Sequence, residues 1–71
     1  MATTHDVTDN IVYDLVSIQY HALQAVDSYD KYLGDAHREE HEGITKFIEQ
    51  CRTEDLERAR RCHQLLGDLT T

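Results

Sequence analysis

The chain has 71 residues, of which 39% are apolar and 30% charged, with three glycines and no proline. A chain of this length forms one small domain, and the scarcity of turn residues favours helices over strands. Fourteen acidic and seven basic residues give a net charge of −7, which repels nucleic acid phosphates and anionic membranes, so neither is an expected partner.

The cellular compartment follows from two features of the sequence. No apolar run approaches the roughly 18 residues of a membrane span, and residues 1–6 lack the segments of a secretory signal. We therefore expect a cytoplasmic protein, with residues 1–7 flexible. Cys51 and Cys62 lie about 16 Å apart in one predicted helix at 1.5 Å per residue, so they are expected to remain thiols that pack as small apolar groups.

The first predicted helix spans residues 8–34, where apolar side chains recur at helical spacing. Three further apolar residues widen that side beyond what a two-stranded seam requires, so we expect it to contact more than one helix. The apolar side consists of Ile11, Leu15, Ile18, Ala22, Val26, Tyr29 and Leu33, widened by Val12, Val16 and Leu23.

A second helix is predicted over residues 43–68, after a polar connection over 35–42 that Gly34 and Gly43 bracket. Helix-forming residues inside the connection predict a tight turn and an antiparallel hairpin. The apolar side of the second helix consists of Ile44, Phe47, Ile48, Cys51, Ala59, Cys62, Leu65, Leu66 and Leu69.

The predicted fold class is all-α. A lone hairpin leaves both wide apolar sides in water, and each exposed Leu or Ile forgoes roughly 1.5–3 kcal/mol of burial. We therefore expect two hairpins to pair as a homodimeric four-helix bundle, with a higher oligomer as an open alternative.

Two charged residues interrupt the apolar side of the second helix near its centre. Asp55 and Arg58 both point inward by helical phase, and a buried charge needs a partner, so we expect them to pair with each other or across the dimer. On the first helix, Gln19 lies one turn from Ala22, whose small side chain leaves room for a long one, and we expect Gln19 to join Asp55 and Arg58 in an interior polar network.

These residues carry a resemblance to a known family. The segments 22–29 with 35–36, and 53–59, resemble stretches of the two-helix encapsulated ferritins and other rubrerythrin-like hairpins of the ferritin-like superfamily, and the similarity extends over residues 15–69. The resemblance implies a hairpin that dimerises into a ferritin-like four-helix bundle with an iron site at the dimer interface. Ala25 and Tyr29 match that pattern.

The metal ligands of that pattern are replaced in this chain. Ala22 and Asp55 stand where the family has glutamates, and Arg58 stands where it has a histidine. Arginine has no lone pair for a metal, so we hypothesise that an Asp55–Arg58 pair has replaced the di-iron site. The expected protein is not an enzyme, needs no cofactor, and has a structural or protein-interaction role.

The alternative is an iron- or zinc-binding protein for storage or sensing, which would use Asp55 together with Glu54 and Glu57, or the histidines. His37 and His41, with Glu40 beside them, have the spacing that places two imidazoles on one helical face for zinc.

Two tyrosines suggest a further contact. Tyr13 and Tyr20 lie one heptad apart on the less apolar side of the first helix, and tyrosine is favoured at interfaces. They are a candidate surface for a protein partner or for assembly beyond a dimer.

Overall fold

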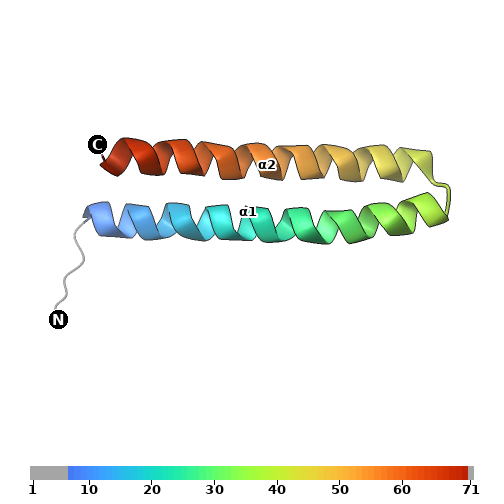
Figure 1. Ribbon diagram of the computed structural model, residues 1–71, viewed down its shortest axis with the longest axis horizontal. Coiled ribbons are helices and arrows are strands. Elements are labelled where there is room, and N and C mark those ends of the chain that lie inside the picture. The colour runs from blue at the N-terminus through green and yellow to red at the C-terminus, as the bar shows by residue number, and fades with distance from the viewer. Residues whose placement is uncertain (1–6, 71) are drawn as a thin grey trace.

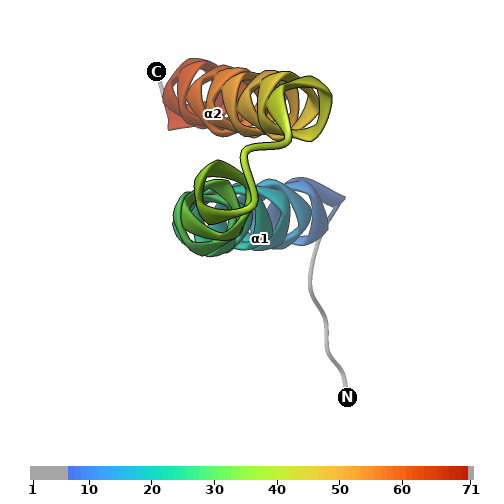
Figure 2. The same cartoon turned by 90° about the vertical axis from the view of Figure 1, so that its right-hand side faces the viewer.

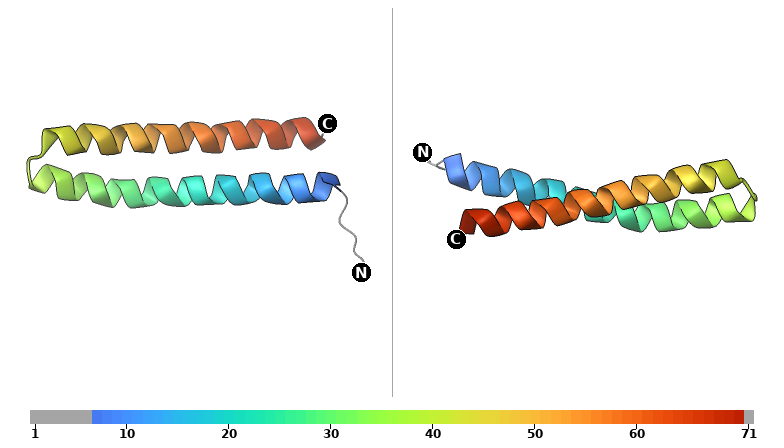
Figure 3. Two further views of the ribbon diagram at one scale, coloured as in Figure 1. Left: turned by 180° about the vertical axis from the view of Figure 1, so that it is seen from behind. Right: turned by 90° about the horizontal axis from the view of Figure 1, so that it is seen from above.

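The protein is an antiparallel hairpin of two long helices. The computed structural model describes the backbone of residues 7–70 and the side chains of residues 10–69. Helix α1 (Val7–Arg38) and helix α2 (Glu42–Thr70) run side by side along their whole length, joined by a short turn at one end (Figure 1). Figure 2 views the pair along the length of the helices, from the end that carries the turn. Figure 3 shows that the helices cross at a shallow angle. The predicted all-helical hairpin is confirmed.

The boundaries of the helices differ from those predicted. Helix α1 continues to Arg38 rather than ending at residue 34, so the connection is residues 39–41 and not 35–42. Gly34 lies inside α1, where a single glycine costs only about 1 kcal/mol. Asp35 forms ion pairs with Lys31, at 3.5 Å, and with Arg38, which support the last turns of the helix. Of the segment 1–7 predicted to be flexible, residues 1–6 lie outside the described residues and Val7 begins α1.

Helix α1 ends at a residue that adopts the left-handed backbone conformation although it is not glycine. Glu40 has a φ of 54°, its amide donates to the carbonyl of His37 at 3.0 Å, and the amide of His41 donates to that of Ala36 at 3.1 Å. This pair of hydrogen bonds is the Schellman motif, in which glycine usually occupies the left-handed position. The turn is therefore tight although it contains no glycine.

Helix α2 begins with a histidine as its capping residue. The Nδ1 atom of His41 accepts a hydrogen bond from the amide of Ile44 at 3.3 Å, which satisfies one of the free amides of the first turn. The hydroxyl of Thr45, which is buried, donates to the carbonyl of His41 at 3.0 Å. These bonds fix the direction in which α2 leaves the turn.

The interior of the hairpin is built from small side chains. Ala22, Ala36, Ala59 and Cys62 are the buried apolar residues among those described, and no described side chain of any size is fully buried. The radius of gyration is 16.6 Å, against about 11 Å for a compact domain of this length. Within residues 7–70, neither helix combines the length and apolarity that crossing a membrane requires. The hairpin is thus a rod whose larger apolar side chains are left partly uncovered.

An open apolar face and its charged cluster

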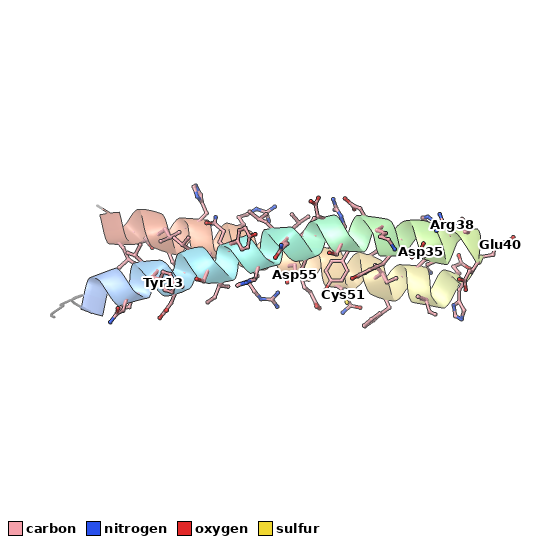
Figure 4. The ribbon with its side chains drawn as sticks, turned by 90° about the horizontal axis from the view of Figure 1, so that it is seen from below. Tyr13, Asp35, Arg38, Glu40, Cys51 and Asp55 are labelled. Atoms are coloured by element: carbon pink, nitrogen blue, oxygen red, sulfur yellow. The ribbon has the colours of Figure 1, made fainter. Side chains whose placement is uncertain are left out.

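A charged cluster lies at the middle of the rod, where α2 faces α1 (Figure 4). Only 13% of the Asp55 side chain is exposed, and its Oδ1 accepts a hydrogen bond from Nη1 of Arg58. The Tyr29 hydroxyl, from α1, also hydrogen-bonds to Asp55, and this bond raises the pKa of Tyr29 above its ordinary value of 10.0, with desolvation adding to the shift. Asp55 therefore joins both helices through one carboxylate.

Arg58 lies at the edge of the hairpin rather than inside it. Its side chain is 53% exposed and borders a hollow of about 300 Å³, which α1 lines with Ser17, Ile18, His21 and Ala22. A guanidinium has five N–H donors. The guanidinium therefore has donors beyond the one used on Asp55, and it borders a hollow that a single hairpin leaves open.

Gln19 was predicted to join this cluster, but the structure gives it another partner. Its side-chain amide donates to the carbonyl of Ala59 at 3.5 Å, across the helix interface. Gln19 thus ties α1 to α2 one turn away from Ala22, separately from the Asp55–Arg58 pair.

The cluster is surrounded by uncovered apolar side chains. Ile18 and Arg58 border both the hollow at mid-length and a groove that also contains Leu65, while Tyr32 and Ile44 border a third cavity nearer the turn. Helical spacing adds Ile11 and Leu69, both at the end of the rod away from the turn, and Phe47 beside Ile44. We call this surface the open face, and it comprises Ile11, Ile18, Tyr32, Ile44, Phe47 and Leu69, all of them exposed.

A second group of exposed apolar residues lies on the other side of α1. Tyr13 and Tyr20 are 71% and 60% exposed, and Val16 and Leu23 are about half exposed. The four residues follow one another at intervals of three and four, so they form a short stripe well separated from the open face. We call it the tyrosine stripe.

The residues of the metal-binding alternative are not brought together as a metal site. His37 lies in the last turn of α1 and His41 follows the turn, so the four-residue helical spacing is lost. Both border a cavity of about 400 Å³, in which the Nδ1 of His41 already caps α2. Glu54 accepts a hydrogen bond from Gln50 at 3.2 Å. Glu57 lies along the groove.

Within the described residues, no three or more His, Cys, Asp or Glu side chains are grouped so as to hold a metal ion. Asp55 is held by a cation and a hydroxyl instead.

Two contacts between the helices were not predicted. One is the bond from Tyr29 to Asp55, and the other is the ion pair of Arg52 with Asp30, at 2.9 Å. Counted from Glu40 in the turn, Asp30 and Arg52 lie 10 and 12 residues away and Tyr29 and Asp55 lie 11 and 15 residues away, so the members of each pair lie within about one helical turn of the same level. With the position of the turn known, both contacts could have been predicted from the sequence.

Comparison of the chain with protein-family models, curated proteins and solved structures finds no match.

Proposed function

We propose that this chain is a non-enzymatic, ferritin-like hairpin whose open face pairs with a second copy to complete a homodimeric four-helix bundle with a structural or protein-interaction role. In this proposal the Asp55–Arg58 pair takes the place of a di-iron site. The observation that carries the proposal is the inverted burial of the hairpin: small side chains are buried, and the large apolar ones of the open face are not.

The apolar area of the open face is large enough for a second copy to offset the cost of association. A homodimer would bury twelve large side chains, six from each copy, and each is roughly half exposed. Completing their burial is worth about 1 kcal/mol per side chain, or about 10 kcal/mol in all. That is comparable to the roughly 4–15 kcal/mol that association costs, and the partly exposed residues between them add to the gain.

The charged cluster supports a bundle that needs no metal. In a di-iron bundle the metal ions neutralise the carboxylates that face the core. Here the Arg58 guanidinium supplies a fixed positive charge to Asp55, and arginine stays protonated at any physiological pH. Tyr29 adds a neutral hydrogen bond to the same carboxylate.

Matched substitutions on the two sides of α1 test which surface makes the dimer. Ile18 on the open face and Leu23 on the tyrosine stripe are similarly exposed, at 44% and 49%. Sedimentation equilibrium of the wild type should give a dimer. Ile18→Glu should convert it to a monomer, because it buries an unpaired charge, whereas Leu23→Glu should leave the dimer intact. A dimer that survives Ile18→Glu but not Leu23→Glu would contradict the proposal.

The tyrosine stripe is the proposed contact for a further protein or for assembly beyond the dimer. Its aromatic residues offer large apolar area with a polar tip, as interface residues commonly do. The double substitution Tyr13→Ala with Tyr20→Ala should remove any species larger than a dimer while the dimer itself persists. If larger species form equally with and without the tyrosines, this part of the proposal is wrong.

A further inference from the structure

The side of α2 that carries exposed apolar residues at both of its ends, Ile44 and Leu69, follows a pattern that reads the same in both directions. A stripe beginning at Ile44 and ending at Leu69 advances by four and three residues alternately. The pattern is symmetric about the midpoint between Leu56 and Glu57, because positions at equal distances from that point are both members. The stripe consists of Ile44, Ile48, Cys51, Asp55, Arg58, Cys62, Leu65 and Leu69.

Helix α1 carries a stripe with the same symmetry. It begins at Ile11, ends at Ala36, and is symmetric about the midpoint between Leu23 and Gln24. That midpoint is as many residues before Glu40 as the midpoint of α2 is after it, so both lie at the same level of the rod. The α1 stripe consists of Ile11, Leu15, Ile18, Ala22, Ala25, Tyr29, Tyr32 and Ala36.

Contacts between the helices confirm that these midpoints lie side by side. Gln19 reaches Ala59 on one side of this level, and Asp30 reaches Arg52 on the other. A two-fold axis perpendicular to the rod at this level therefore places each stripe of one copy against the same stripe of a second copy, position against symmetric position. This is the requirement for an isologous interface.

We propose that two copies stack with their turns at opposite ends, about a two-fold axis that places Asp55 of each copy against Arg58 of the other. This inference rests on the proposed function, because it describes how the two open faces meet. Position by position, Ile44 then faces the partner's Leu69, and Ile48 faces the partner's Leu65. Cys51 lies at the level of the partner's Cys62, which is already buried within its own hairpin. The second copy thus covers apolar residues with apolar residues on both sides of the charged pair.

The charges at the axis determine this arrangement. Each Arg58 already bonds its own Asp55, has donors left over and borders the hollow. Across the axis these donors meet the partner's Asp55, so two carboxylates and two guanidiniums alternate around a closed and neutral ring. On α1, the small side chains of Ala22 and Ala25 lie at the same level and leave space for the guanidiniums. A stack with both turns at the same end would set Arg58 against alanines and leave its donors unpaired.

Charge reversal tests the ring directly. The Asp55→Arg chain and the Arg58→Asp chain each place four like charges at the axis, so each homodimer should be about 100-fold weaker or worse. Mixing the two chains sets an opposite charge against every charge across the axis, although neighbours within each chain stay alike, and should yield a one-to-one heterodimer, which native mass spectrometry resolves because the chains differ in mass. Lys46→Asp, a matched reversal at an exposed position outside the stripe, should dimerise like the wild type. Homodimers of normal strength, or a mixture that forms no heterodimer, would overturn the proposal.

Cross-linking keeps the proposal testable if the reversed chains do not fold. In a background of Cys51→Ala and Cys62→Ala, a chain carrying Ile44→Cys is mixed with one carrying Leu69→Cys. A short bismaleimide should then couple unlike chains only, because two copies of position 44 lie roughly 37 Å apart along the rod in this arrangement.

The outcomes separate the two proposals. Coupling of like chains through position 44, or a wild-type dimer with no coupling of unlike chains, overturns the two-fold arrangement and leaves the dimer standing. A monomeric wild type overturns the proposed function itself.

Discussion

At the scale of single residues, the charged cluster depends on a carboxylate with two donors. Asp55 and Arg58 could be found from the sequence because they interrupt an apolar side at helical spacing. The bond from Tyr29 could not, because it depends on which levels of the two helices face each other, and a turn predicted only to lie within residues 35–42 does not fix those levels. Arg58 is also more exposed than its helical phase suggested, because its long side chain reaches past the edge of a single hairpin.

The Tyr29–Asp55 bond predicts a loss of stability at high pH. The hydroxyl donates only while protonated, and the folded state raises its pKa above the ordinary value of 10.0. The resulting stabilisation is therefore complete below pH 10 and is lost as pH rises through the raised pKa. In thermal unfolding, the melting temperature of the wild type should fall over that pH range more steeply than the melting temperature of Tyr29→Phe. A pH titration of tyrosinate absorbance should show that the tyrosine missing from Tyr29→Phe is one that ionises above pH 10. Identical pH profiles for the two proteins would contradict the bond.

At the scale of the elements, the two helices follow from apolar periodicity, and the expected tight turn is present. Its position was not predictable from glycine, because Gly34 and Gly43 lie inside the helices and a glutamate takes the left-handed position. Local ion pairs of Asp35 and the Schellman bonds of the turn support the longer helix.

Glu40 is the position at which the turn can be improved. A left-handed conformation costs a residue with a Cβ about 1–2 kcal/mol, and glycine avoids this cost but loses more conformational entropy on folding. Glu40→Gly should therefore stabilise the protein by about 0.5–1 kcal/mol in chemical denaturation. Glu40→Ala retains a Cβ and should bring no such gain. A gain of equal size from both substitutions would show that removing the negative charge is responsible.

The cap of α2 gives a second prediction at this scale. His41→Ala removes the acceptor for the Ile44 amide and should cost about 0.5–2 kcal/mol, whereas His41→Asp supplies a preferred capping oxygen and should preserve stability. Urea denaturation of the three proteins measures both effects. If alanine and aspartate are equally destabilising, the histidine acts through something other than its cap.

At the scale of the whole molecule, the sequence predicts the need for a partner more firmly than it predicts the role of the protein. The count of apolar residues and the width of both apolar sides already required a cover, and the half-exposed residues of the open face are consistent with that requirement. In our proposal, the cellular role depends on what the tyrosine stripe contacts. A sequence pattern of two tyrosines offers a surface but does not identify what binds to it.

The most direct test is native mass spectrometry of the wild-type protein, before and after incubation with ferrous iron and with zinc. One spectrum reports the number of subunits and any bound metal together. We predict a dimer whose mass does not change with either metal, because the carboxylate that a metal would need is held by Arg58 and Tyr29. A folded monomer at micromolar concentration would contradict the bundle. A dimer that takes up a stoichiometric metal would contradict the replacement of the metal site by an ion pair.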